Sequence, residues 1–280
     1  MMFLPESKMQ WLGFFVLALI AVSLLFIGIR LVRNLQYRLL YYPSSTAPSD
    51  AFYRANKLKP WGKSGMDYRG LVSIIEPQSN KGTIIVFHGN GGTAADRTFY
   101  LDALGGLGYR VVLAEYPMYG GRKGELGEKA FVSDAVESTV LAFKDFGGPF
   151  FILGESMGCG VAAAVAREAP VHVDGVILIT PWETLVAIAH EKFPFLPVRL
   201  FLRDEYDTIK NLDSFRGRIA IIGAEHDEVI PVGHAGRLYE ALPAPAKRMW
   251  IFRKAGHNDW YVSADNKWWQ EVMAFISGES

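Results

Sequence analysis

The feature that most constrains the fold is the sequence Gly-Glu-Ser-Met-Gly at residues 154–158. The apolar run at 149–153 predicts a buried strand before it, and the small, alanine-rich run at 159–168 predicts a helix packed on a sheet after it. Gly-x-Ser-x-Gly between a strand and a helix is typical of a sharp turn that presents a nucleophilic serine, where glycines avoid clashes. Ser156 is therefore the candidate nucleophile. The alternative is a tight turn whose serine does no chemistry.

From about residue 68 the chain alternates between short apolar runs and helical stretches. The expected strands lie at 70–75, 83–87, 110–114, 149–153, 175–179, 219–222 and 248–252. The expected helices lie at 93–107, 127–146, 158–167, 235–241 and 266–275. Short apolar strands separated by helices predict a mostly parallel sheet covered on both faces. We therefore expect one doubly wound α/β domain at residues 66–280, preceded by an approach segment at 30–65.

Two further side chains complete a candidate triad, because a serine hydroxyl is a poor nucleophile without a base. His257 follows the last expected strand, and loops at the carboxyl ends of parallel strands are where such a sheet places its chemistry. Asp227 follows the strand before it and would orient the imidazole. The order Ser, Asp, His is the one that accompanies this serine turn. Glu225 and Glu228 on the same loop compete with Asp227 for that role, whereas Asp259, close to His257 in sequence, is better explained by solvation of its loop.

The oxyanion that forms during acyl transfer needs two backbone N–H donors. One is expected from Met157, the residue after the nucleophile, at the positive end of the helix that starts there. The other is expected from Asn90, with Gly91 as the alternative, in a glycine-rich loop. His88 in the same loop is expected to brace it rather than to act as a base. A phosphate-binding loop is a rival interpretation, but the lysine and serine or threonine that end such a loop are missing.

Taken in chain order, these loops resemble the α/β-hydrolase superfamily, and the chain looks most like the membrane-anchored esterase/lipase-like branch of the α/β-hydrolase domain-containing proteins. The resemblance covers about residues 38–276 and is carried by the motifs at 40–43, 87–92, 154–158, 206–207, 227–231 and 256–257. It implies an α/β-hydrolase fold and serine hydrolase activity without a cofactor. Some relatives cleave acyl thioesters from proteins, and others cleave lipid or small esters. The chain departs from the pattern at Pro117 and Met118, where similar proteins usually have Arg or Gly, so the resemblance extends to the triad but not to the details of the acyl pocket.

Residues 181–213 interrupt the alternation of strands and helices, at the place where this fold carries a cap. The insert is rich in large apolar side chains, which would favour an apolar acyl group if they line the site. Trp182, Phe193 and Phe195 are the candidate residues of the substrate pocket. The alternative is that these side chains only pack the insert against the domain.

A second long apolar run, at residues 11–29, carries no charge. As a helix it would extend about 28 Å, close to the thickness of a bilayer's hydrocarbon core. We expect a single-pass anchor after a tail at 1–10, in preference to a cleaved signal peptide or a buried core helix, because the run is long and ends in arginine and bulky residues. Lys8 precedes it and three arginines follow, at positions 30, 33 and 38, so the catalytic domain is expected on the cytoplasmic side.

Composition narrows the function further. The formal net charge of zero argues against a nucleic-acid partner. The only cysteine, Cys159, rules out an intramolecular disulfide and is expected to be a small core residue, and no metal-binding motif is present. The sequence thus predicts a membrane-anchored serine hydrolase that cleaves esters or thioesters of small-molecule, lipid or acyl-protein substrates. A peptidase or amidase with the same triad and a non-catalytic membrane scaffold are the alternatives, and the oligomeric state stays open.

Overall fold

A sheet of eight strands forms the centre of the computed structural model, which describes residues 6–63, 67–244 and 246–279. Its strand order is β10-β9-β8-β7-β4-β6-β3-β2. The strands are β2 (Leu58–Trp61), β3 (Gly70–Ser73), β4 (Thr83–Phe87), β6 (Arg110–Ala114), β7 (Phe150–Glu155), β8 (Gly175–Ile179), β9 (Arg218–Ala224) and β10 (Lys247–Phe252). Strands β4 and β6 to β10 are parallel, whereas β3 is antiparallel to both β6 and β2. The predicted mostly parallel sheet is confirmed.

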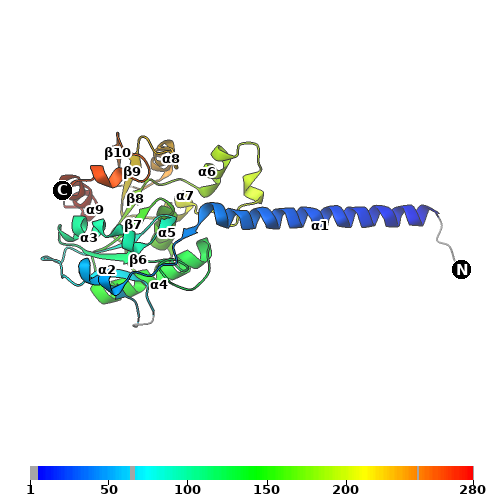
Figure 1. Cartoon of the computed structure of the whole chain (residues 1–280). Coiled ribbons are helices and arrows are strands. Elements are labelled where there is room, and N and C mark those ends of the chain that lie inside the picture. Colours follow the sequence, from blue (N-terminus) through cyan, green and yellow to red (C-terminus); the bar gives the residue numbers. More distant parts are fainter. Residues whose placement is uncertain (1–5, 64–66, 245, 280) are drawn as a thin grey trace.

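Helices cover both faces of this sheet (Figure 1). One core contains side chains of α4 (Glu128–Phe146), α5 (Met157–Glu168), α7 (Thr208–Leu212) and α8 (Gly233–Ala241). The other contains side chains of α3 (Phe99–Gly105) and α9 (Asn266–Ser277). Successive strand residues alternate between the two cores, as Ile84 and Ile85 of β4 do. Both faces of the central strands are therefore buried, which explains why the sequence shows them as continuous apolar runs.

Part of the segment before residue 66 is built into the folded domain, whereas the sequence predicts only an approach segment there. Helix α1 (Glu6–Leu40) runs beyond the apolar stretch, α2 (Asp50–Ala55) follows, and β2 pairs with β3 at the edge of the sheet. A short ladder of β1 (Tyr42–Pro43) with β5 (Gly91–Gly92) joins the segment to the glycine-rich loop. The sequence conceals β2 because Lys59 and Pro60 occupy its two exposed positions, and proline is tolerated on an edge strand.

Helix α1 projects from the domain as a single long rod (Figure 1). Its part from Gly13–Leu40 is long and apolar enough to cross a membrane by length and composition, a test that a signal sequence also passes. The insert at 181–213 leaves the domain near the base of this rod and contains α6 (Leu185–Lys192) and the short turn η2 (Val198–Leu200). Two other 3-10 turns, η1 (Ala94–Arg97) and η3 (Trp260–Ser263), lie in loops beside the serine turn and the histidine loop.

Candidate active site

Ser156 occupies the sharp turn between β7 and α5 that the sequence predicts. Its backbone has φ 55° and ψ −118°, a conformation that is strained for a residue with a side chain. A Cβ on Gly158 would lie 2.0 Å from the Phe87 carbonyl oxygen, and one on Gly154 would lie 2.4 Å from the Gly158 carbonyl oxygen. Both glycines are therefore required for the close approach of backbone that presents the serine.

The structure brings Ser156, His257 and Asp227 into one hydrogen-bonded series. His257 Nε2 lies 3.0 Å from Ser156 Oγ, and His257 Nδ1 lies 2.7 Å from Asp227 Oδ2. All three residues are buried, with between 6% and 8% of their surface exposed. They come from the carboxyl ends of β7, β9 and β10, which is where the sequence places the chemistry. These distances are within reach for direct proton transfer between serine and imidazole.

The Asp227 carboxylate is held by its own loop. Its Oδ1 accepts hydrogen bonds from the backbone N–H groups of Val229 (2.9 Å) and Ile230 (2.6 Å). The second oxygen is thereby left for His257 Nδ1, so the backbone fixes both the position and the orientation of the carboxylate.

The competing acids have other positions. Glu225 is exposed. Glu228 Oε2 accepts the backbone N–H of His257 at 3.4 Å, and Asp259 Oδ1 accepts the N–H of Gly256 at 2.6 Å. Glu228 and Asp259 therefore brace the histidine loop, whereas Asp227 faces the imidazole.

Two backbone segments beside Ser156 can provide the oxyanion donors. The N–H of Met157 is the first of α5 and has no carbonyl partner within the helix. The glycine-rich loop passes directly beside the serine, because a Cβ on Gly89 would lie 3.4 Å from Ser156 Cβ.

The peptides on either side of Asn90 are oriented by the contacts of their carbonyl groups. The Gly89 oxygen lies 2.8 Å from His88 Nδ1, and the Asn90 oxygen accepts Tyr42 N–H (3.1 Å) and Tyr119 Oη–H (2.7 Å). In a trans peptide the N–H points opposite to the carbonyl. The N–H groups of Asn90 and Gly91 are thus fixed in direction, and the choice between them remains a prediction.

Buried and partly buried charged side chains that the sequence did not reveal hold these loops together. Glu115 Oε1 lies 2.9 Å from His88 Nε2, and its Oε2 accepts the N–H of Ala94 at 3.0 Å. His88 therefore braces the loop, as expected. On the other side, Glu155 of the serine turn pairs with Arg97 Nη2 at 2.9 Å. A charged residue directly before the nucleophile was the available signal for such a pair, because a buried charge needs a partner.

The structure separates the three candidate residues of the substrate pocket. Trp182 is buried, and its Nε1–H donates to the Tyr206 carbonyl at 3.2 Å. Phe193 and Phe195 are 48% and 98% exposed. In this conformation the two phenylalanines line no enclosed acyl site, and the pocket role of the three residues stays a prediction.

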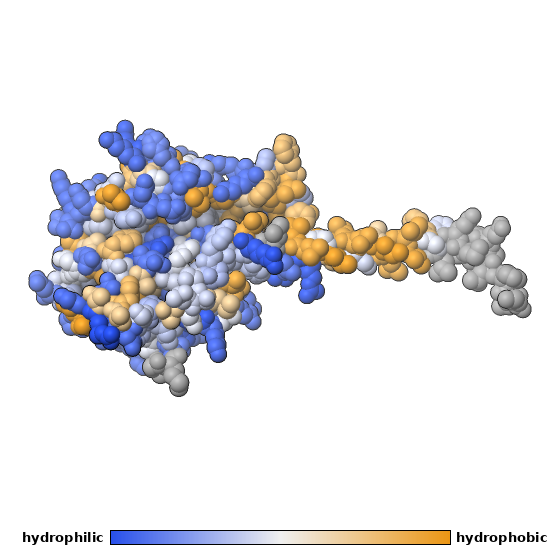
Figure 2. Space-filling model, in the orientation of Figure 1, coloured by the Kyte–Doolittle hydropathy of each residue, from blue (hydrophilic) through white to orange (hydrophobic). Residues whose placement is uncertain are grey.

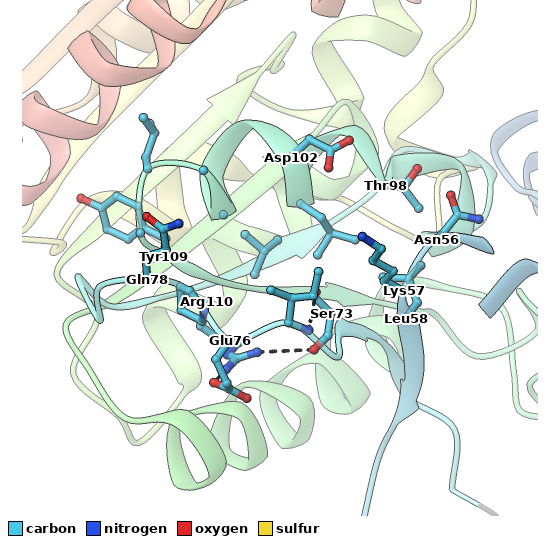
Figure 3. Close-up of a pocket in the computed structure, with 18 of the residues that line it drawn as sticks. Asn56, Lys57, Leu58, Ser73, Glu76, Gln78, Thr98, Asp102, Tyr109 and Arg110 are labelled. Atoms are coloured by element: carbon cyan, nitrogen blue, oxygen red, sulfur yellow. Dashed lines mark hydrogen bonds and ion pairs between the residues drawn. The ribbon is translucent and has the colours of Figure 1, made fainter. Parts of the chain in front are cut away.

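A broad surface hollow of about 700 Å³ lies at the opposite end of the sheet (Figure 3). Ser73 at the end of β3 and Arg110 at the start of β6 line it, together with Asp102 of α3. The triad residues follow the carboxyl ends of the parallel strands, so this hollow is distant from the serine turn. Within the described part of the chain, no group of three His, Cys, Asp or Glu side chains could hold a metal ion.

The sequence is similar to one protein family model and to several known proteins. The family model described as serine aminopeptidase, S33, matches residues 78–203. The uncharacterized protein Rv2307c of Mycobacterium tuberculosis is 30% identical over 235 residues, which cover 80% of this chain and 81% of that protein. Lysophosphatidylserine lipase ABHD12 of Mus musculus is 26% identical over 211 residues, which cover 69% of this chain and 52% of the lipase.

Solved structures share the fold at low sequence identity. An esterase of Pyrococcus furiosus, Pf2001, superposes with a TM-score of 0.62 and 18% identity, covering 85% of this chain and 97% of the esterase. A monoacylglycerol lipase of Paleococcus ferrophilus superposes with a TM-score of 0.55 and 16% identity, covering 73% of this chain and 97% of the lipase.

Proposed function

We propose, from the premise that the chain belongs to the α/β-hydrolase superfamily, that it is a serine hydrolase of carboxylic esters or thioesters of acyl substrates. The observation that carries the proposal is the series of hydrogen bonds from Ser156 through His257 to Asp227. A superfamily fold alone does not imply an activity. The burial of these three side chains at the end of the sheet supports a catalytic role, because a scaffold would have no use for the arrangement.

In the proposed mechanism Ser156 Oγ attacks the substrate carbonyl while His257 Nε2 takes its proton. Asp227 holds the imidazole in orientation and stabilises the imidazolium. The N–H groups of Met157 and of Asn90 or Gly91 bind the oxyanion, and a donor of this kind contributes on the order of 10²–10³-fold in rate. His257 then gives the proton to the leaving group, and a water molecule activated by His257 cleaves the acyl-enzyme.

The names of the relatives favour ester chemistry. They include an esterase, a monoacylglycerol lipase and a lysophosphatidylserine lipase. A peptidase is the second candidate, and the description of the matching family as a serine aminopeptidase is the observation that favours it. The two are distinguished by comparing p-nitrophenyl esters with aminoacyl p-nitroanilides as substrates. If the anilides are turned over faster than the esters, the proposed function is a peptidase and not an ester hydrolase.

We also propose that α1 anchors the protein by a single membrane span, with the catalytic domain on the cytoplasmic side. Apart from half-buried Ile29, the described large apolar side chains of the run 11–29 are exposed along α1, and such a surface needs lipid or protein around it. The full chain should stay with membranes in sodium carbonate. Release by carbonate, or a mature chain cleaved after the apolar run, would contradict the anchor.

A further inference from the structure

The insert carries an exposed apolar surface that lines no enclosed site in this conformation. Phe193, Phe195, Leu196 and Leu200 are 48%, 98%, 51% and 61% exposed, and we call these four residues the apolar tip. A contiguous surface of large apolar side chains on a soluble face marks a contact with a partner or with a membrane. The tip is therefore a docking surface whose occupant must be identified from its surroundings.

The residues that follow the tip are locked to the end of α1. The N–H of Arg203 donates to Gln36 Oε1 at 2.7 Å, and its guanidinium lies over the Tyr37 ring at 5.5 Å. Next to it, the Tyr41 hydroxyl donates to Asp204 Oδ2 at 2.7 Å in a buried contact. These contacts join the base of the insert to the end of α1, so the tip leaves the domain at a defined level along the helix.

The tip lies beside the part of α1 where the uncharged apolar run ends and the basic residues begin. Phe26, Ile29, Arg30 and Arg203 surround one hollow beside the helix. Ile29 is the last residue of the uncharged run, and Arg30 is the first charge after it. Figure 1 shows the segment between α6 and α7 extending along this part of α1, and Figure 2 shows apolar surface continuing from the helix onto the adjoining domain.

We propose that the apolar tip inserts into the interfacial layer of the same bilayer that α1 spans, as a second membrane contact. The inference rests on the proposed membrane span and goes beyond it. Lys192 directly precedes the tip and Arg199 lies within it, and both are exposed, which suits contact with lipid phosphate groups. Aromatic and leucine side chains beside basic residues are the composition of interfacial membrane contacts. Two contacts fix the orientation of the domain on the bilayer, which one helix cannot do.

The test places a fluorescent label on the tip of the full chain. The only cysteine, Cys159, is fully buried, so a Phe195→Cys variant can be labelled selectively with an environment-sensitive nitrobenzoxadiazole dye. The protein is reconstituted into vesicles of phosphatidylcholine and phosphatidylglycerol with or without spin-labelled lipid. We expect a blue-shifted emission that spin-labelled lipid quenches by roughly half or more, as for an interfacial side chain. The matched control is Ile74→Cys, 57% exposed at the opposite end of the sheet, which should stay unquenched.

A third label separates failure of the tip from failure of the span. Leu19→Cys, 65% exposed on α1, reports whether the helix is in lipid. If the label at residue 19 is quenched but the label at residue 195 is not, the tip contact alone is overturned. If neither label is quenched, the tip contact and the span are overturned together. If the emission of the label at residue 195 shifts only as protein concentration rises, the tip contacts a second copy of the chain. If it shifts only after acylation of Ser156, the tip is part of a lid. Either result overturns the proposal.

Discussion

The end of the sheet that holds the candidate triad and the apolar tip are built in opposite ways. Around Ser156 the side chains are buried, and backbone groups hold the carboxylate that faces the imidazole. At the tip, Phe195 is 98% exposed, and only the base of the insert is tied down. Rigid elements thus hold the candidate triad, while the exposed surface beside α1 would, as the proposed second membrane contact, set where the chemistry is used. Substitutions in the two regions should therefore have separable effects.

The largest effect is expected from Ser156→Ala. Ester hydrolysis should fall by a factor on the order of 10⁴ or more, because no other group can form the acyl-enzyme. The melting temperature should change little, since only one oxygen is removed from the turn. Exposed Ser214→Ala is the matched control and should keep full activity. Near-normal turnover by Ser156→Ala would contradict the mechanism.

The next effect concerns the carboxylate that faces the imidazole. Asp227→Asn should lower kcat by about 10³-fold or more, because the imidazole loses the group that fixes its tautomer and stabilises its charge. Glu225→Gln, on the same loop but exposed, should change kcat less than about twofold. If kcat for a soluble ester fell equally in the two variants, Asp227 would not be the residue that orients the imidazole.

The third effect is on stability. Gly158→Ala should lower the free energy of unfolding by roughly 3 kcal/mol, because its Cβ would meet the Phe87 carbonyl oxygen at 2.0 Å. Gly236→Ala in α8 is the control, since no atom beyond the adjacent residues and the backbone of its own helix lies within 4 Å of the added Cβ. That variant should be more stable by about 0.5–1 kcal/mol. Urea denaturation of both variants checks the difference, and similar stabilities would disprove the crowded turn.

The smallest effect is expected at the tip. Phe195→Ser should lower kcat/KM about threefold for an ester embedded in vesicles, because one buried aromatic contact with the bilayer is lost. Turnover of a short soluble ester and the melting temperature should stay the same, since the side chain is 98% exposed. If soluble longer-chain esters suffered more than vesicle-bound ones, Phe195 would line an acyl site, as the sequence predicts.

The sequence predicts the elements that local apolar runs define. The strands β4, β6 and β8 have the predicted bounds because each is a short run buried on both faces. That Ser156, Asp227 and His257 would meet could be predicted because each lies in the turn or loop that follows a strand, and the carboxyl ends of parallel strands meet at one edge.

The remaining features depend on contacts between residues far apart in the chain. The charge of Glu155 signals that it needs a partner, but nothing in the sequence identifies Arg97 as that partner, and nothing pairs Glu115 with His88. The exposure of Phe195 could not be predicted either, because an apolar side chain in an insert looks the same in sequence whether it is buried or not.

Covalent labelling of the full chain by a fluorophosphonate tests the central claim most directly. The reagent reacts with a serine only when a base and an oxyanion site activate it, so the adduct reports the whole arrangement rather than the fold. We expect one adduct per chain on Ser156, located by mass spectrometry, and none in Ser156→Ala or after thermal unfolding. Absence of an adduct in well-folded protein, or the same adduct yield in Ser156→Ala, would contradict the proposed serine hydrolase.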